Sequence, residues 1–229
     1  MQLGLTPWRL SGSVDALELT RQASLAEGWG YESFWLPENH FTGDAAIPEP
    51  LMLLAAVAAG TRTIRLATTS YLLPVRHPLQ AAEQVAVLDK LSGGRVVLGV
   101  GRGYATAMFS AFSVSRKAKR EIFRDCLDVM MRAWQGEPVA LDETSEPVLL
   151  SPLPLQKPHP PIWVAAFGPK ALRQAGTLGF PYLASPMEPI GRLRENYESH
   201  RLACIEAGVR IPEEPLSFDL RWQSRLERR

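Results

Sequence analysis

The sequence predicts an α/β fold of the (β/α)8 TIM-barrel type, in which parallel strands alternate with helices. Two observations support this prediction. Short apolar and β-branched runs alternate with segments of helical periodicity along most of the 229 residues. The run at 96–100 is apolar on both faces, as a parallel strand covered by helices requires. About six strand–helix units can be counted, whereas a closed barrel takes eight units and about 250 residues, so we expect a barrel that is incomplete at its C-terminal end.

Each expected element follows from a local pattern. Strands are expected at 2–6, 33–36, 64–71, 96–100, 162–165 and 182–184, with a further one at 216–222. Helices are expected at 14–27, 50–59, 77–91, 116–134, 170–178 and 190–207. The fourth of these helices is the clearest, because its apolar residues recur at the spacing of one helical face. The whole chain, 1–229, is expected to form a single domain with a frayed polar tail at about 223–229.

Polar side chains are expected to stabilise both ends of the helix at 77–91. His77 precedes Pro78 at its start and is interpreted as a cap rather than as a catalytic group. The turn at 92–94 contains two glycines and ends the helix. Asp89 and Arg95 flank this turn, and we expect them to pair across it in a structural role.

Charge and composition exclude several classes of function. The 25 Lys and Arg residues nearly balance the 24 Asp and Glu residues, which argues against a nucleic-acid or membrane-surface binder. No apolar run approaches the roughly 20 residues that span a bilayer, and the first residues lack the pattern of a signal peptide. Cys126 and Cys204 do not belong to a Cys-x-x-Cys pair. We therefore expect a cytoplasmic protein without a structural metal.

Candidate site residues follow four of the predicted strands, at the carboxyl ends where parallel α/β folds gather their ligands. They are Glu38, Asn39 and His40, then Thr69 and Ser70, then Gly99, Gly101, Arg102, Gly103 and Tyr104, and finally Phe167 and Gly168. On the residues alone, His40 is either pocket-lining or structural. Glu38 is a base, a polar clamp or a solvated acid.

Two of these loops favour an anionic ligand. The glycines around Arg102 let the backbone approach a ligand closely, and its guanidinium offers a planar fork for a phosphate. The alternative reading of this loop is a tight turn. Free N–H groups near Gly168 open a helix, and helix N-termini attract phosphate. The basic run at 116–121 is either a solvated helix start or a further phosphate contact. Together these features favour a phosphorylated cofactor.

Four motifs carry a resemblance to a known family. They are WLPENHF at 35–41, HPLQAAE at 77–83, DKLSGGRVVLGVGRG at 89–103 and PHPPIWVAA at 158–166. In this order and spacing the chain resembles the bacterial-luciferase-like flavin monooxygenases over about residues 1–210.

The resemblance implies an FMN- or F420-dependent oxidoreductase on a (β/α)8 barrel. Its FMN members use reduced FMN and oxygen to oxidise a small organic substrate, and a separate flavin reductase supplies the reduced flavin. Members commonly form homodimers. Arg102 between two glycines favours FMN here. The alternatives are an F420-dependent dehydrogenase of the same superfamily and a non-catalytic, truncated relative that only binds flavin.

The resemblance also implies roles for particular residues. Arg102, Gly103 and Tyr104 would hold the flavin phosphate, together with backbone donors of Phe167 and Gly168. Thr69 and Ser70 would form a non-prolyl cis peptide beneath the flavin ring.

The expected catalytic residues are Glu38, Asn39 and His40, and two positions depart from the luciferase pattern. Asn39 stands where luciferases have a catalytic histidine, and asparagine cannot shuttle a proton near neutral pH. Gly101 stands where luciferases have a reactive cysteine.

Overall fold

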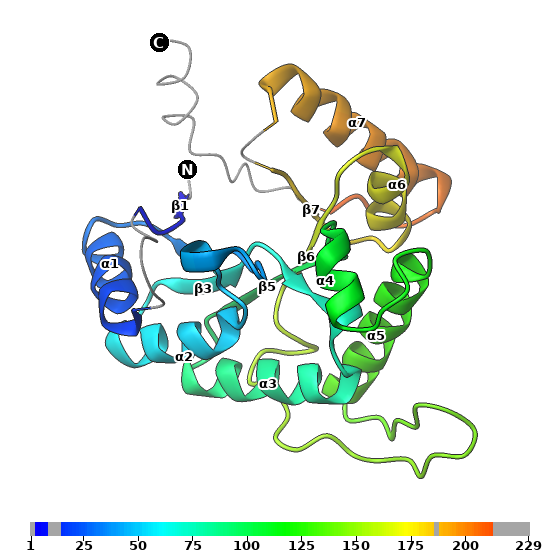
Figure 1. Ribbon diagram of the computed structural model, residues 1–229, viewed down its shortest axis with the longest axis horizontal. Coiled ribbons are helices and arrows are strands. Elements are labelled where there is room, and N and C mark those ends of the chain that lie inside the picture. The colour runs from blue at the N-terminus through cyan, green and yellow to red at the C-terminus, as the bar shows by residue number, and fades with distance from the viewer. Residues whose placement is uncertain (1–2, 9–14, 186–187, 213–229) are drawn as a thin grey trace.

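The computed structural model describes residues 3–8, 15–185 and 188–212, and its described strands form one parallel sheet (Figure 1). The strand order is β1-β2-β3-β5-β6-β7, and β4 pairs with β5 off this path. The strands are β1 Gly4–Leu5, β2 Ser33–Leu36, β3 Arg65–Thr68, β4 Tyr71–Leu72, β5 Val96–Gly101, β6 Ile162–Ala165 and β7 Tyr182–Leu183. Every pairing between them is parallel. All their carboxyl ends therefore lie at the same edge of the sheet.

Helices connect the strands and cover the outside of the sheet, as Figure 1 shows for α1, α2, α3 and α5. The α-helices are α1 Ala16–Gly28, α2 Pro50–Gly60, α3 Pro78–Leu91, α4 Thr106–Ala111, α5 Lys119–Trp134, α6 Pro169–Thr177 and α7 Ile190–Glu206. Two short 3-10 helices lie at Gly43–Ala45 and Leu73–Val75. The helices α6 and α7 pack on each other beside β6 and β7.

The two faces of the sheet bury different clusters. One face contributes Phe34, Leu66 and Leu98 to the main core, which the helices complete. Alternate residues point the other way, and Trp35, Ala67 and Val97 form a second cluster on the inner face. Because successive side chains of a strand point to opposite faces, this two-layer arrangement is that of a curved barrel wall. The predicted fold class is confirmed as a parallel, curled half-barrel.

Most predicted elements are present, with differences at three places. The expected strand at 64–71 is divided into β3 and β4, and the peptide bond between Thr69 and Ser70 in the gap is cis. The short helix α4 was not expected, and α5 begins at Lys119 rather than at 116. The predicted strand at 216–222 and the predicted tail at 223–229 lie outside the described residues. The single-domain prediction for 1–229 stays a prediction.

The predicted pair of Asp89 and Arg95 is wrong. Asp89 is fully buried and accepts hydrogen bonds from the backbone N–H and side-chain amide of Gln156, at 2.9 and 2.8 Å. Arg95 donates instead to Thr61 Oγ1 at 2.9 Å and to the Ile64 carbonyl at 2.8 Å. Each side chain braces the fold against a segment distant in sequence. His77 occupies the N-cap position of α3, but its side chain makes no capping hydrogen bond.

Candidate functional site

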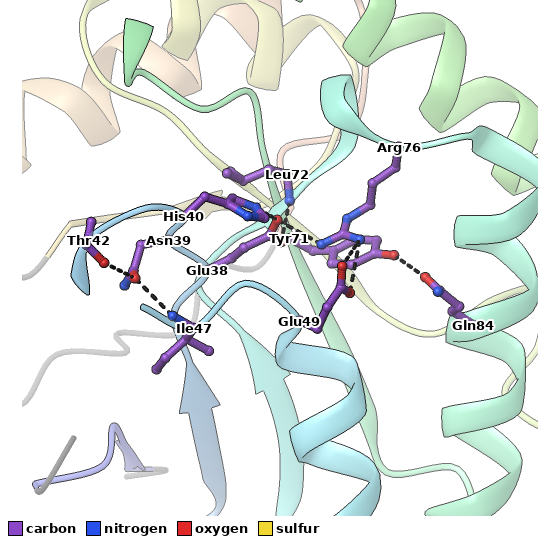
Figure 2. A network of polar contacts seen from close by, with 10 residues as sticks. All are labelled: Glu38, Asn39, His40, Thr42, Ile47, Glu49, Tyr71, Leu72, Arg76 and Gln84. Atoms are coloured by element: carbon purple, nitrogen blue, oxygen red, sulfur yellow. Dashed lines mark hydrogen bonds and ion pairs between the residues drawn. The ribbon is translucent and has the colours of Figure 1, made fainter. Parts of the chain in front are cut away.

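A buried carboxylate, Glu38, anchors a network at the carboxyl end of β2 (Figure 2). Its Oε1 accepts hydrogen bonds from His40 Nε2 and from an Arg76 guanidinium nitrogen, both at 2.8 Å. Its Oε2 accepts from the backbone N–H of Leu72 at 3.0 Å. Both oxygens are occupied, so Glu38 joins the loop after β2 to β4 and to the segment that leads into α3. Of the three readings of Glu38, this geometry favours the polar clamp.

Arg76 is held on three sides. Besides Glu38, it donates to both carboxylate oxygens of Glu49, at 3.2 and 3.3 Å. Its guanidinium lies over the ring of Tyr71, 3.9 Å from the centroid, and Tyr71 donates to Gln84 on α3 at 2.8 Å. Burial alone would lower the pKa of Arg76, but Tyr71 and the two carboxylates outweigh it and raise that pKa. The guanidinium therefore stays a fixed positive charge.

His40 lies between this network and an aromatic pair. Its bond to Glu38 uses Nε2, and Nδ1 makes no hydrogen bond to any described residue. The ring lies edge-on to Phe112 with centroids 5.0 Å apart, and it also contacts Phe41 at 5.8 Å. Phe41 is 65% exposed and adopts a positive φ of 59°, a conformation that side chains rarely take. The His40 ring is therefore flanked by two phenylalanine rings, and its Nδ1 is the ring nitrogen that is not bonded to Glu38.

Asn39 points into its own loop. Its side-chain oxygen accepts hydrogen bonds from the Ile47 N–H at 3.0 Å and from the Thr42 hydroxyl at 2.8 Å. Backbone hydrogen bonds between Asn39 and Ile47 close the same loop. The side chain therefore holds the loop that carries His40, and a catalytic role for Asn39 stays a prediction.

The residues predicted beneath the flavin ring form a tight floor. Thr69 donates its backbone N–H to the Leu36 carbonyl at 2.8 Å and continues into the cis bond that the resemblance implies. Gly101 lies against Ser70, and a Cβ added at Gly101 would collide with the Ser70 hydroxyl. A side chain at 101 would force the Ser70 side chain to move, and glycine leaves this close approach undisturbed.

Arg102 and Lys119 form a cationic cluster beyond this floor. Arg102 is 8% exposed and donates to Gln174 Oε1 at 2.8 Å and, at 3.4 Å, to the Ala165 carbonyl. Lys119 Nζ donates to the Gly103 carbonyl at 2.9 Å. Burial lowers the pKa of Arg102 to about 10, and Arg120 adds to this. Burial and the neighbouring arginines also lower the pKa of Lys119. In the part of the chain that the structure describes, neither has a carboxylate partner, so the cluster favours an anion.

The remaining predicted cofactor residues lie around this cluster. Tyr104 is 80% exposed and Phe167 is 56% exposed. Gly168 precedes α6 with a positive φ of 78° and open space beside it. The bonds of Arg102 to β6 and α6 bring the two predicted anion features together.

Sequence reasoning missed several residues of both clusters. Arg76 stands beside His77, which drew attention as part of a motif, and its partner Glu49 carried no signal. Lys119 lay inside the basic run at 116–121, which the sequence left open as a phosphate contact. Gln174 offered no signal, because its contact with Arg102 joins residues 72 positions apart.

The described residues contain no group of three or more His, Cys, Asp or Glu side chains placed to hold a metal ion. None of their helices is long and apolar enough to cross a membrane.

The fold and the site define a class: a β/α-barrel protein that binds its ligand at the carboxyl ends of its strands. The sequence model of the luciferase-like monooxygenases matches residues 3–215, and the chain belongs to this family. The resemblance stated from the four motifs is confirmed.

The curated relatives are longer than this chain. The uncharacterized protein y4vJ of Sinorhizobium fredii is 33% identical over 180 residues, which cover 76% of this chain and 51% of the relative. The oxygenase component of the flavin-dependent trigonelline monooxygenase of Acinetobacter baylyi is 26% identical over 190 residues, which cover 80% of this chain and 53% of that relative. The chain spans about half the length of these relatives.

Solved structures share the fold. Monooxygenase RslO1 from Streptomyces bottropensis superposes with a TM-score of 0.82 at 30% identity, covering 95% of this chain and 69% of that one. The oxygenating constituent of 3,6-diketocamphane monooxygenase from Pseudomonas putida, in complex with FMN, gives 0.78 at 24% identity, covering 93% and 65%. The F420-dependent tetrahydromethanopterin reductase of Methanopyrus kandleri gives 0.74 at 22%, covering 91% and 61%. At 24% and 22% identity, the last two structures show only that the fold is shared.

Proposed function

We propose that this chain is the oxygenase part of a two-component flavin monooxygenase, which uses reduced FMN and oxygen to oxidise a small organic substrate. The observation that carries the proposal is the pair of buried Arg102 and partly buried Lys119, which have no carboxylate partner among the described residues, at the edge of the sheet where the strands end. A phosphate monoester is the complementary group, since its two negative charges would offset the mutual repulsion of these cations.

The donor set fits FMN at each part of that molecule. Arg102, Gly103 and Tyr104 would hold the phosphate with Lys119, and Phe167 and Gly168 would offer backbone donors. The Thr69–Ser70 peptide and Gly101 would form the floor beneath the ring, where the absence of side-chain bulk permits close approach.

The chain's own residues would position a substrate and manage one proton. Bound FMN supplies the redox chemistry of oxygen activation. Glu38 holds His40 so that Nδ1 is the ring atom able to accept or return a proton, so His40 is the proposed catalytic residue and Glu38 positions it. Phe41 and Phe112 flank His40 and would exclude water from an apolar substrate. Asn39 would act through the loop geometry, because it cannot move a proton itself.

The proposed reaction requires a partner protein that supplies reduced flavin. A relative that carries "oxygenase component" in its name points to a separate reductase as the source of reduced flavin. We expect a homodimer and a cytoplasmic location, where such a reductase and its reduced nucleotide are at hand.

An F420-dependent dehydrogenase is the second candidate, because the fold superposes on an F420-dependent reductase and the cationic cluster also suits a larger anion. Fluorescence titration of the purified chain with FMN and with F420 separates the two. We expect FMN to bind at least tenfold more tightly, and reduced FMN bound to the chain to consume oxygen. Preference for F420 would favour the dehydrogenase, and flavin binding without altered oxygen consumption would leave a non-catalytic flavin binder.

A further inference from the structure

We propose that Arg76 is a positioning residue, which acts through Glu38 to keep His40 in the Nε2–H tautomer and to offset the carboxylate charge that would otherwise favour a charged imidazole. The use of His40 in the reaction rests on the proposed function, whereas the arrangement of the three side chains stands on the structure alone.

Convergence on one oxygen atom is the central observation. His40 and Arg76 both donate to Oε1 of Glu38 at 2.8 Å, and the Glu38 side chain is completely buried (Figure 2). A buried carboxylate beside an imidazole normally favours the imidazolium, since opposite charges attract strongly where water is excluded. Arg76 supplies a permanent positive charge to the same oxygen. A second positive charge on His40 is therefore less favourable than it would be beside Glu38 alone.

The bond to Glu38 also selects the tautomer. A carboxylate oxygen only accepts hydrogen bonds, so the His40 nitrogen that faces it must carry the proton. That nitrogen is Nε2, and Nδ1 is left with its lone pair. Arg76 keeps the Glu38 carboxylate oriented, because the guanidinium is itself held by Glu49 and by the Tyr71 ring.

The charged side chains near His40 determine whether removal of Arg76 favours or disfavours a positive charge on the ring. The charged or titratable groups of this network are Glu38 on the same loop, Glu49 before α2, Tyr71 on β4 and Arg76 before α3. The other rings that contact His40, Phe41 and Phe112, carry no charge. Without Arg76, the Glu38 carboxylate would face His40 with no cation among the side chains of this network. His40 would then take up its proton at higher pH.

If Arg76 had a purely structural role, its removal would not change the protonation of His40 through charge. Arg76 also fastens the loop after β2 to the segment before α3, through Glu49 as well as Glu38. If fastening were its only task, Arg76→Gln and Glu49→Gln would both loosen the loop, and neither would shift the protonation of His40 in a charge-dependent way. Glu49→Gln is thus the matched control, because it breaks the Arg76–Glu49 contact and leaves the Arg76–Glu38 contact in place.

The experiment is nitrogen-detected NMR of the histidine rings over a pH series. The chain has four histidines, and His40→Asn identifies the signal. We expect the Nε2–H tautomer in the wild type. In Arg76→Gln, the titration midpoint of His40 should move about one pH unit higher. Arg76→Lys should stay near the wild type because the charge is kept, and Glu49→Gln should move the midpoint by less than half as much and toward lower pH.

Several results would overturn the proposal. They are an Nδ1–H tautomer in the wild type, an unchanged midpoint in Arg76→Gln, or the same change in Arg76→Gln and Glu49→Gln. If Arg76→Gln does not fold, the wild-type tautomer and the direction of the Glu49→Gln shift still decide, because an Nδ1–H tautomer or a shift of Glu49→Gln toward higher pH would overturn the proposal. FMN affinity, measured in parallel, tests the proposed function separately, since the ring signals need no bound flavin.

Discussion

At the scale of single residues, burial and hydrogen bonding separate the roles that the sequence left open. Glu38 accepts hydrogen bonds from three donors, and His40 keeps one ring nitrogen available. The side-chain oxygen of Asn39 accepts hydrogen bonds from its own loop. These three polar side chains, adjacent in sequence, thus perform different tasks. Of the three, His40 alone keeps a titratable atom without a hydrogen bond to a described residue.

The loop role of Asn39 can be tested by stability. In Asn39→Ala, the Thr42 hydroxyl loses its acceptor and the Ile47 N–H keeps only the Asn39 backbone carbonyl, so we expect the free energy of unfolding to fall by about 1 kcal/mol. Asn39→Asp keeps an oxygen at the same place and should lose less than half of that. Urea unfolding measures both variants. An alanine variant as stable as the wild type would show that the loop does not depend on this side chain.

At the scale of elements, distant carboxylates fix the joints between helices and strands. Glu27 at the end of α1 accepts hydrogen bonds from the backbone N–H groups of Arg62 and Ile64, at 2.9 and 2.8 Å, and from Thr63. Burial would raise the pKa of Glu27, but these hydrogen bonds outweigh it and lower the pKa to about 2. The ionised carboxylate thereby ties α1 to the turn before β3.

This lowered pKa predicts a pH-dependent contribution to stability. A carboxylate whose pKa is lower in the folded state stabilises above its unfolded pKa and loses that contribution as the pH falls toward 2. Glu27→Gln should therefore cost about 1 kcal/mol at pH 7, after discounting for solvent exposure, and progressively less below about pH 4.5. Urea unfolding at pH 7, 4 and 3 checks this. The exposed Glu32→Gln serves as control, and a constant cost of Glu27→Gln at every pH would contradict the prediction.

The close approach of β3 and β5 gives a second prediction at this scale. A Cβ at Gly99 would collide with the Thr68 carbonyl oxygen and approach Leu183 Cδ2 to 2.8 Å. Gly99→Ala should destabilise the fold by about 1–3 kcal/mol, because neither backbone can move without breaking the sheet. Gly191→Ala, in the first turn of α7 with open space around it, should instead be neutral or stabilise by up to about 1 kcal/mol. Equal effects of the two substitutions in thermal or urea unfolding would contradict this reading.

The sequence predicts regular elements well and long-range contacts poorly, for a physical reason. The strand at 33–36 and the helix ending at Trp134 follow from local hydrophobic periodicity, and both are confirmed. The division of the strand at 64–71 falls at Thr69 and Ser70, where Ser70 lies against Gly101 on a neighbouring strand, and no local hydrophobic pattern predicts it. Arg76 was missed because its partners Glu38 and Glu49 lie 38 and 27 positions away.

At the scale of the whole molecule, parallel topology explains why the site lies where it does. All described strands end at one edge, so loops from β2, β5 and β6 meet there without being close in sequence. The inner layer of Trp35, Val97 and Leu183 supports them from below. The chain belongs to the luciferase-like monooxygenases and spans about half the length of its curated relatives.

The most direct test of the proposed cofactor site compares FMN and riboflavin on the wild type and Arg102→Ala. Riboflavin lacks the phosphate, so it reports the ring site alone. Because a charge-assisted hydrogen bond contributes about 1.5–3 kcal/mol, Arg102→Ala should weaken FMN binding by roughly 10-fold to 150-fold and leave riboflavin binding unchanged. Equal affinity of the wild type for FMN and riboflavin, or unchanged FMN affinity in Arg102→Ala, would contradict a phosphate site at Arg102.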